Sequence, residues 1–543
     1  MKFFSIDNKK TRPLIVTLLF AAGIIVGILI NKVNVPKIEG IVGPASFVDG
    51  SSKFDEVMWY VGHEYVDVPD VYDLQDHAIT AMVEELDPHS AYVSKDEFNE
   101  VNDPLLGSFD GIGVQFRLEK DTIAVVSVIK GGPSEKVGIL AGDRIIYIDD
   151  TLAAGVKMTN EKVMRKLKGP KNTKVKVGVM RRGAEGLFDY TITRAAIPTY
   201  SVDIAYMLDE KTGYLKLSKF SATTVDEFKK ATRELKSQGM KQLIFDLRGN
   251  SGGYLTAAVE IADEFLPKGS LIVYTEGRNR PRNYMKASRL GMWEKLPVAV
   301  LIDGESASAS EIVAGALQDN DRGTIIGRRS FGKGLVQEQI MLSDKSALRL
   351  TVARYYTPTG RSIQKPFDGD REKYIFESYE RYENGELFHP DSIHFADSLK
   401  YTTPGGRIVY GGGGIMPDIY VPLVDDSTEY YFNRIVNLGL LYQYAFDYTD
   451  LHRQQLQRYK TVDTFKKSFW VSDTMFNELV KLADEKGIKG SYRQKQVARR
   501  KVNTLLKAYI ARNLFDDEGF YPIYAPMDEV LQKAIVTLRQ AEK

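Results

Sequence analysis

The residues of this chain best suited to chemistry are a serine and a lysine, each set among small residues. Ser308 lies in the run Ser-Ala-Ser-Ala-Ser-Glu at 306–311, and Lys333 lies 25 residues later between two glycines. A serine hydroxyl needs a positioned base to act as a nucleophile. Burial lowers the pKa of a lysine because it disfavours the ammonium form. The pair therefore predicts a serine nucleophile with a lysine base.

A Ser-His-Asp triad is the weaker alternative. None of the six histidines lies between the first strand of the catalytic region and Gln337. His89 is the histidine preceded by a proline, in the run Leu-Asp-Pro-His-Ser-Ala-Tyr at 86–92. This setting predicts a structural hydrogen bond for His89 rather than a catalytic role.

The elements around Ser308 are those that could position a nucleophile. Residues 297–303 are predicted to form a buried strand, 304–306 a turn and 307–319 a helix. Ser308 would then lie in the first helical turn, where free backbone N–H groups and the helix dipole favour negative charge. A second glycine loop, Asp-Leu-Arg-Gly-Asn-Ser-Gly-Gly at 246–253, follows an apolar strand and could supply oxyanion donors.

Five motifs in order give the chain a wider resemblance. They are the loop at 246–253, Ser-Ala-Ser-Ala-Ser-Glu-Ile at 306–312, Gln318-Asp319, Phe-Gly-Lys-Gly-x-Val-Gln at 331–337, and Tyr-Thr-Pro-x-Gly-Arg-x-Ile-Gln at 356–364. Over roughly residues 54–424 the chain resembles the carboxy-terminal processing peptidases, the tail-specific proteases of the S41 serine peptidase family. The resemblance implies Ser308 as nucleophile, Lys333 as general base and Gln337 as the residue orienting the lysine. It also implies that the N–H groups of Gly252 and Ala309 form the oxyanion hole.

The expected distances along the chain decide whether Asp319 can reach Ser308 and whether Gln337 can reach Lys333. Some descriptions of the family place an aspartate in the charge relay, and Asp319 holds the matching position. One continuous helix would separate it from Ser308 by about 16 Å, which favours a structural carboxylate that pairs with Arg322 or caps a turn. In an extended strand, Lys333 and Gln337 would be about 13 Å apart, so they meet only if the chain turns or the side chains lean together.

Composition excludes several classes of function. The chain has 543 residues, 43% of them hydrophobic and 27% charged, with a formal net charge of +1. This is enough material for several domains, and it gives no overall attraction to nucleic acid. The absence of cysteine removes disulfides, thiol catalysis and cysteine-rich metal sites. No metal or organic cofactor is implied.

The amino terminus predicts attachment to a membrane. Residues 14–30 form an uncharged, mostly apolar run preceded by Lys2, Lys9, Lys10 and Arg12. No small-x-small cleavage site follows at once, so an uncleaved signal anchor is favoured over a removed signal peptide. The positive flank would keep this end cytoplasmic. The remaining chain would then be extracytoplasmic, and periplasmic in a Gram-negative cell.

Residues 109–194 look like a PDZ domain. Gly-Ile-Gly-Val-Gln-Phe at 111–116 opens a strand, and the run from Gly131 matches the loop, short helix and strand of that fold. In the resembling fold the glycine loop binds a terminal carboxylate while the peptide adds as a strand. The expected N–H donors are Ile112, Gly113 and Val114. A tight turn without binding is the alternative, and no nucleotide motif is present.

The catalytic region alternates strands and helices, which predicts a layered α/β sheet. Strands are expected at 213–220, 242–247, 271–274, 298–303 and 324–327, and helices at 225–238, 255–266 and 307–319. The resemblance implies the fold of Clp protease and the crotonases. The polar segment 278–290 is expected to be a mobile loop near the site. From residue 429 the periodicity is helical, with an apolar face expected at Phe465, Phe469, Trp470 and Phe476.

The expected fold is multidomain, α/β and α+β, with an inserted PDZ domain and helical flanks. Its parts are a cytoplasmic tail and transmembrane signal anchor (1–31), a linker (32–53), an N-terminal helical region (54–100), the PDZ domain (101–194), the S41 core (195–425) and a C-terminal helical extension (426–543).

The function expected is a membrane-anchored serine endopeptidase that cleaves proteins with exposed apolar carboxyl termini. The helical flanks are compatible with a homodimer, and the sequence leaves open whether an adaptor or activator is needed. Two other classes stay open: a non-catalytic PDZ scaffold that binds carboxyl termini at the membrane, and a crotonase-like acyl-CoA enzyme.

Overall fold

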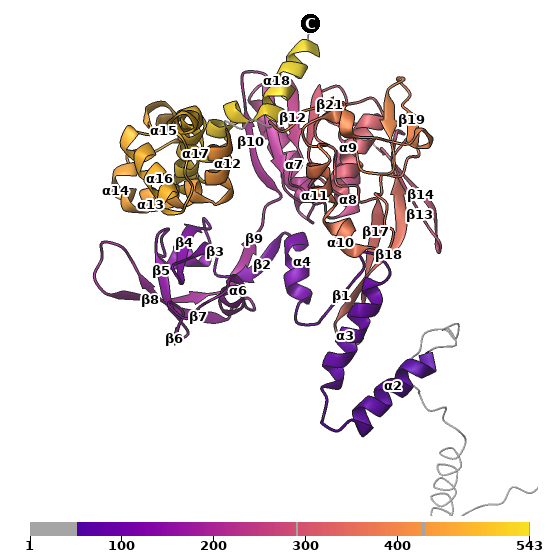
Figure 1. The fold of residues 1–543 in the computed structure, drawn as a ribbon, viewed down its shortest axis with the longest axis horizontal. Helices are drawn as coiled ribbons and strands as arrows, with labels where there is room; N and C mark the ends of the chain where they lie inside the picture. Colours follow the sequence, from indigo (N-terminus) through magenta and orange to yellow (C-terminus); the bar gives the residue numbers. More distant parts are fainter. Residues whose placement is uncertain (1–50, 289–290, 425–428, 542–543) are drawn as a thin grey trace, which may run out of the picture. The chain divides into compact units, whose positions relative to one another are not determined.

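The computed structural model describes residues 51–288, 291–424 and 429–541. The chain divides into two units, residues 1–79 and 80–543. Helix α2 (Ser51–Glu64) belongs to the first unit, and α3 (Val71–Glu84) crosses the boundary (Figure 1). None of the described helices combines the length and apolar character needed to cross a membrane. The predicted anchor at 14–30 lies outside the described residues.

A six-stranded sheet forms the centre of the predicted catalytic region, in the order β10-β11-β12-β15-β16-β21. Every neighbouring pair is parallel except β10 with β11. All residues of β12 and β15 are buried, as expected for strands covered on both faces. The strands are β10 (Val202–Met207), β11 (Thr212–Leu217), β12 (Gln242–Asp246), β15 (Val298–Ile302), β16 (Thr324–Gly327) and β21 (Ile419–Tyr420).

Helices cover both faces of this sheet. Along β15, Val298, Val300 and Ile302 pack in one core with α7 (Thr224–Ser237), α8 (Leu255–Asp263) and α9 (Ala309–Asp319). The alternate residues Ala299 and Leu301 pack in a second core with α18 (Glu529–Ala541). The layered α/β core predicted from the sequence is confirmed, and its strands and helices lie within a few residues of the predicted positions.

A second sheet holds the strand that carries Gln337. It contains β1 (Ala91–Val93), β13 (Leu271–Gly277), β14 (Arg280–Lys286), β17 (Leu335–Met341) and β18 (Ala347–Tyr356). The expected mobile loop at 278–290 is wrong, because β14 pairs with β13 as a hairpin. Its polarity is that of an exposed edge strand: Arg282 pairs with Glu276 at 2.9 Å, and charged side chains on an edge discourage pairing with other chains.

The segment predicted to be a PDZ domain forms an antiparallel sheet in the order β3-β4-β5-β7-β8, with β6 paired to β5. Its own hydrophobic core includes Ile123, Ile145 and Val177. A ribbon of β2 (Ser108–Gly111) and β9 (Ala195–Pro198) joins the points where the chain enters and leaves the domain. The other elements are β3 (Val114–Glu119), β4 (Thr122–Val128), β5 (Arg144–Ile148), β6 (Thr151–Leu152), β7 (Lys174–Met180), β8 (Leu187–Thr193), α5 (Pro133–Val137) and α6 (Asn160–Leu167).

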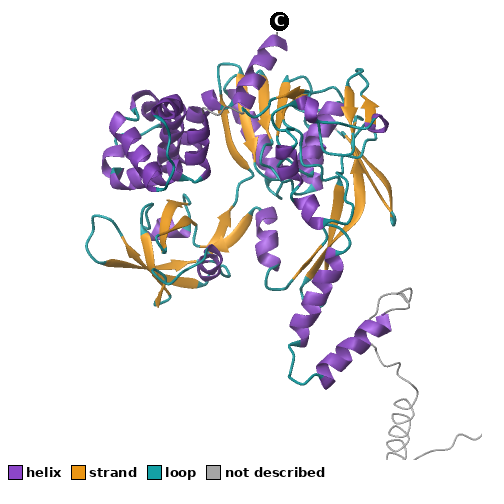
Figure 2. Ribbon diagram, in the orientation of Figure 1, coloured by secondary structure: helices purple, strands orange, loops and turns teal. Residues whose placement is uncertain are grey.

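Helices from α12 (Tyr430–Asn437) to α17 (Tyr492–Tyr524) form a separate bundle with its own core (Figure 2). Phe465, Phe469 and Phe476 lie in that core, as expected, but Trp470 is 76% exposed and does not belong to the apolar face. The helix α15 ends at Ser468, so the helical period no longer places Trp470. The other bundle helices are α13 (Leu440–Leu451), α14 (Arg453–Leu456), α15 (Val462–Ser468) and α16 (Asp473–Glu485).

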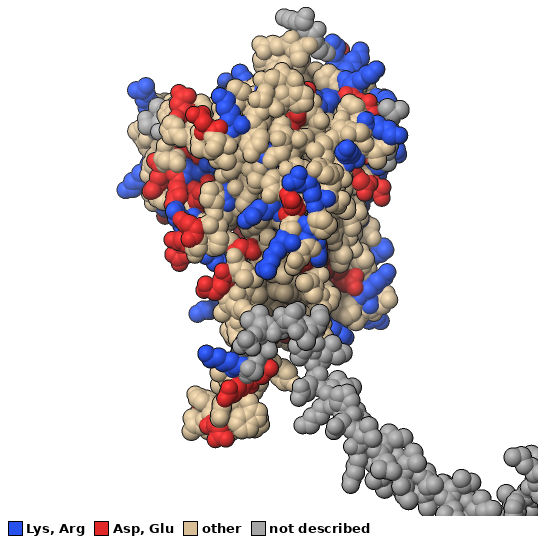
Figure 3. Space-filling model, turned by 90° about the vertical axis from the view of Figure 1, so that its right-hand side faces the viewer, with Lys and Arg blue, Asp and Glu red and all other residues tan. Residues whose placement is uncertain are grey.

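Short elements complete the described chain. They are α4 (Phe98–Leu106), α10 (Arg371–Ile375), α11 (Glu377–Glu383), β19 (Lys400–Thr402) and β20 (Ile408–Tyr410), with single 3₁₀ turns at 390–392, 397–399 and 525–527. On the face of the molecule shown in Figure 3, lysine and arginine side chains lie among aspartate and glutamate side chains.

Candidate active site

Ser308 lies at a sharp turn between a buried strand and a helix. It is the N-cap of α9, with φ 55° and ψ −112°. A residue with a side chain seldom adopts positive φ, and such strain often marks a functional position. The turn before it is fixed by Asp303, whose carboxylate accepts hydrogen bonds from the N–H groups of Gly249, Glu305 and Ser306. The strand–turn–helix geometry resembles that of other serine nucleophiles.

The glycine loop at 246–253 lies directly against this turn. The carbonyl of Asn250 accepts hydrogen bonds from the Ala307 N–H at 3.0 Å and the Ser310 hydroxyl at 2.9 Å, on either side of Ser308. Asn250 also donates its side-chain amide to the Leu217 carbonyl. The sequence predicted that the two loops meet, but it gave no role to the buried asparagine that joins them.

The two predicted oxyanion donors differ in their present hydrogen bonding. The Gly252 N–H donates to the side-chain oxygen of Asn250 at 2.9 Å. No described residue accepts a hydrogen bond from the Ala309 N–H, which faces the same junction as the first residue of α9. A developing oxyanion would therefore find one donor free and would have to replace the Asn250 oxygen at the other.

Lys333 lies in the loop before β17, and its amine donates to the side-chain oxygen of Gln337 at 2.9 Å. The strand is not regular there, because the pairing of β17 with β18 shifts register between Val336 and Gln337. This irregularity explains how two side chains that a straight strand would separate come into contact. Burial, followed by repulsion from Arg349, lowers the pKa of Lys333, while Asp87 and Glu311 oppose the shift. A lysine with a lowered pKa is more readily neutral and can accept a proton.

Glu311 ties the serine turn to the lysine loop. Its carboxylate is completely buried and accepts hydrogen bonds from the N–H groups of Ser308, Gly332 and Lys333 and from the Ser330 hydroxyl. Burial nevertheless raises the pKa of Glu311 to about 7. The sequence analysis missed this residue. Its position three residues after an N-cap serine is the signal that could have found it.

The Tyr355 hydroxyl makes a second connection. It lies within hydrogen-bond distance of the carbonyl oxygens of both Ser308 and Lys333. The main chains of these two residues are thus held together from both sides. Across residues 51–288, 291–424 and 429–541, no group of three or more histidine, aspartate or glutamate side chains is arranged to hold a metal ion.

Comparisons with known proteins show the family to which the chain is related. The model of peptidase family S41 matches residues 211–372, and the PDZ-domain model matches residues 111–192. A carboxy-terminal-processing protease of Bartonella bacilliformis is 40% identical over 318 residues, which cover 58% of this chain and 72% of that protein. This chain belongs to the carboxy-terminal processing proteases of family S41. As a member of the family it is a serine endopeptidase.

The chain is also similar to a second curated protease and to a solved structure. The carboxy-terminal processing protease CtpA of Bacillus subtilis is 36% identical, with 60% of this chain and 70% of that protein covered. A solved photosystem II D1 C-terminal processing protease is 26% identical, with 69% of this chain and 94% of that chain covered and a TM-score of 0.36. Residues 431–516, in the helical bundle, match a family of unknown function (DUF8443).

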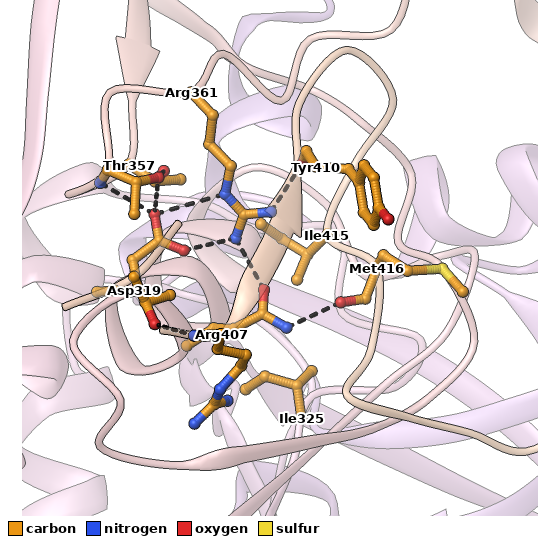
Figure 4. Close-up of polar contacts among 12 residues, drawn as sticks. Asp319, Ile325, Thr357, Arg361, Arg407, Tyr410, Ile415 and Met416 are labelled. Atoms are coloured by element: carbon orange, nitrogen blue, oxygen red, sulfur yellow. Dashed lines mark hydrogen bonds and ion pairs between the residues drawn. The ribbon is translucent and has the colours of Figure 1, made fainter. Parts of the chain in front are cut away.

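In this S41 protease, Asp319 lies at the far end of α9 from Ser308, and its side chain contacts residues outside the Ser308 and Lys333 site. Its carboxylate pairs with Arg361 at 2.7 Å, and both side chains are fully buried (Figure 4). Thr359 donates its N–H and its hydroxyl to the same carboxylate. The predicted pairing with Arg322 is wrong, because the Arg322 guanidinium donates instead to three backbone carbonyls, those of Phe265, Trp293 and Leu296.

The PDZ loop of the protease is held by its carbonyl groups. The Ile112 carbonyl accepts hydrogen bonds from the N–H and the hydroxyl of Ser134, and the Gly113 carbonyl accepts from the Ile129 N–H. Gly113 has φ 76°, which favours glycine. Val114 begins β3, the edge strand of the sheet. The three predicted donor residues therefore form an anchored loop at the start of an open edge.

Replacing Gly252 by alanine is expected to lower kcat by about 10²–10³-fold, as for the loss of an oxyanion donor, because the alanine keeps its N–H but its methyl group displaces that N–H from the oxyanion. A methyl group there would lie 2.7 Å from the Ser308 Cβ and 2.9 Å from the Ala307 carbonyl, and the residue has φ 105°. The matched control is Gly304→Ala, which has nothing within 4 Å of the added methyl. Initial rates on an unstructured protein substrate would show the difference. Equal rates in the two variants would contradict a catalytic role for the loop.

Proposed function

We propose that this S41 protease uses Ser308 as nucleophile and Lys333 as general base to cleave proteins near their carboxyl termini. The observation that supports this most is the buried Glu311 carboxylate, which joins the main chains of Ser308 and Lys333. Two groups held in this way can react as neighbours, and that removes much of the entropic cost of bringing them together.

The chemistry follows from the protonation states. A neutral Lys333 amine takes the proton of the Ser308 hydroxyl as its oxygen forms a bond to the scissile carbonyl carbon. The C–N bond then breaks, and the lysine returns the proton to the leaving amine. The Lys333 amine then deprotonates a water molecule, which attacks the acyl-enzyme. The acyl group leaves as a carboxylic acid, and the proton returns from Lys333 to the Ser308 oxygen, so that both residues are restored. Gln337 holds the amine through its side-chain oxygen.

The oxyanion would be stabilised by the Ala309 N–H, which has no acceptor among the described residues, and by the Gly252 N–H. For the second donor, the substrate oxygen replaces the side-chain oxygen of Asn250. The positive end of the α9 dipole favours the same charge. The hole is thus completed by substrate binding, since one of its donors is used internally before the reaction.

We infer that the PDZ domain captures the substrate tail. Strand β3 lies at the edge of its sheet and can accept an added strand, while the N–H groups of Ile112, Gly113 and Val114 would receive the terminal carboxylate. The run at 14–30 would anchor the chain in a membrane with the protease outside the cytoplasm, a proposal that rests on the sequence alone. A PDZ scaffold without activity is not favoured, because the family is one of proteases.

A comparison of two tails tests this proposal. The full chain should cleave an unstructured protein with an apolar, free carboxyl terminus at least about tenfold faster than the same protein with an amidated terminus, because the amide removes the charge that the loop binds. The ratio should fall towards one at substrate concentrations far above KM. Equal rates for the two tails at low substrate concentration would contradict tail capture, while cleavage of both would leave the protease assignment intact.

A further inference from the structure

The turn that contains His89 lies beside the strand that carries Gln337. The Asp87 carboxylate closes the turn by accepting hydrogen bonds from the N–H groups of His89 at 2.8 Å and Ser90 at 2.9 Å. The Ser90 hydroxyl accepts from the Thr351 N–H at 3.1 Å. Thr351 is the residue of β18 that pairs with Gln337 in β17. The turn is therefore bound to the sheet at the level of Gln337.

The main chain of the turn also fixes the direction of the Gln337 amide. The carbonyl of His89 accepts a hydrogen bond from the Gln337 side-chain nitrogen. An amide has its donors on nitrogen and its acceptor on oxygen. With the nitrogen end held by His89, the oxygen end faces the Lys333 amine, to which it is bonded at 2.9 Å. The lysine is thus oriented by a glutamine that is itself oriented by the turn.

The His89 ring is held in place on its other side. Its Nε2 is hydrogen-bonded to the Tyr374 hydroxyl at 2.8 Å. The same hydroxyl accepts from the Gln364 amide at 3.0 Å, and the Gln364 oxygen accepts from the N–H of Gly334, the residue after Lys333. Through Tyr374 and Gln364, the ring is therefore connected to the lysine loop by a second route.

The ring is neutral in this position. Burial, followed by repulsion from Lys333, lowers the pKa of His89 to about 4. Its recorded contacts among the described residues are with Tyr374 and with the edge of the Phe331 ring, whose centroid lies 6.3 Å away. Neither nitrogen is hydrogen-bonded to Ser308 or Lys333. These contacts make His89 a positioning residue rather than a second base.

We propose that the turn at 87–90, with His89 at its centre, is a positioning element that holds Gln337 and through it the amine of Lys333. The inference rests on the proposed Ser308 and Lys333 chemistry and adds residues from the segment before the PDZ domain to the active site. A site assembled without this turn would keep its nucleophile and base but lose control of where the base points.

His89→Ala tests the proposal. With the ring removed, the turn should shift and kcat should fall by about 10–10²-fold while KM stays within about twofold, because misplacement of a catalytic group acts on the reaction step. The charged groups facing the lysine amine are Asp87, Glu311 and Arg349. They remain, but a less constrained amine is better hydrated and its pKa should rise. The acid limb of the pH–rate profile should therefore move to higher pH.

Two further variants separate positioning from general stability. His89→Gln keeps a side-chain amide that can hydrogen-bond to the Tyr374 hydroxyl as donor or acceptor, and it should restore kcat to within about threefold of the parent and return the acid limb to its position. Tyr374→Phe removes only the hydroxyl and should shift the limb in the same direction as His89→Ala. His394→Ala, at an exposed histidine that is hydrogen-bonded to none of the residues that the structure describes, is the control and should change neither kcat nor the acid limb.

The outcomes are distinct. An active parent whose His89→Ala variant keeps its kcat and its acid limb overturns the positioning role and leaves the proposed function standing. A loss of activity with an unmoved limb, or one that His89→Gln does not repair, shows a merely structural role and also overturns it. An inactive parent overturns the proposed function and, with it, this inference.

Discussion

Replacing Ser308 by alanine is expected to lower kcat by at least about 10⁴-fold, and replacing Lys333 by alanine by about 10²–10⁴-fold. The serine supplies the atom that forms the acyl-enzyme, and the lysine supplies the base that generates it. In the double variant the losses should not add, because the two residues act as one unit. Rates of cleavage of an unstructured protein by the full chain, at equal protein concentration, measure all three.

Two exposed residues of the same core provide matched controls. Ser237→Ala and Lys268→Ala remove the same groups at surface positions and should change kcat by less than about twofold. The parent should also lose activity as the pH falls, because attack requires a neutral Lys333. Burial lowers the pKa of Lys333, but the amine still becomes protonated once the pH falls below that pKa. Cleavage that survives in Ser308→Ala would overturn the site, and a rate that does not decline in acid would exclude the lysine as base.

The Asp319→Ala variant is expected to lower the free energy of unfolding of the catalytic core by about 3–5 kcal/mol, because it leaves the fully buried Arg361 without its partner. Well below the unfolding transition, the folded variant should keep kcat within about threefold of the parent. Urea unfolding followed by the fluorescence of the buried Trp293, with Trp59 and Trp470 replaced by phenylalanine, reports on this core.

An exposed ion pair supplies the comparison for Asp319. Glu276→Ala breaks a pair with Arg282 in which both side chains are nearly half exposed, and it should cost less than about 1 kcal/mol. A folded Asp319→Ala protein with normal stability and a loss of 10²-fold or more in kcat would instead place the aspartate in a charge relay. The position of Asp319 at the opposite end of the eleven-residue helix α9 from Ser308, and its contact with Arg361, argue for the structural result.

The strands and glycine loops of the catalytic core could be predicted closely, because each is recognised from residues that are adjacent in the sequence. The run at 298–302 is apolar throughout and the run at 242–246 has an apolar centre at 243–245, so strands buried on both faces could be recognised without knowing their neighbours. The glycine loops follow such strands, and parallel strands bring their carboxyl ends to one edge. The approach of Gly252 to Ser308 could therefore be expected from the order of elements alone.

What the sequence could not provide depends on distant residues. The partner of Asp319 is 42 positions away, whereas Arg322 is three away and chemically just as suitable. The resemblance implied that Gln337 orients Lys333, but the register shift in β17 that accompanies their contact could not be predicted from the residue types. The polar strand β14 reads as a loop because its pairing with β13 and its exposure become visible only in the folded chain.

The central claim can be tested most directly by labelling the nucleophile. A phosphonofluoridate probe, which reacts with activated serines, should modify the full chain at Ser308, as identified by peptide mass spectrometry. The rate of labelling should rise with pH through the titration of Lys333 and fall by at least about 10²-fold in Lys333→Ala. Labelling at another serine, or at Ser308 with an unchanged rate in Lys333→Ala, would contradict the Ser308 and Lys333 mechanism.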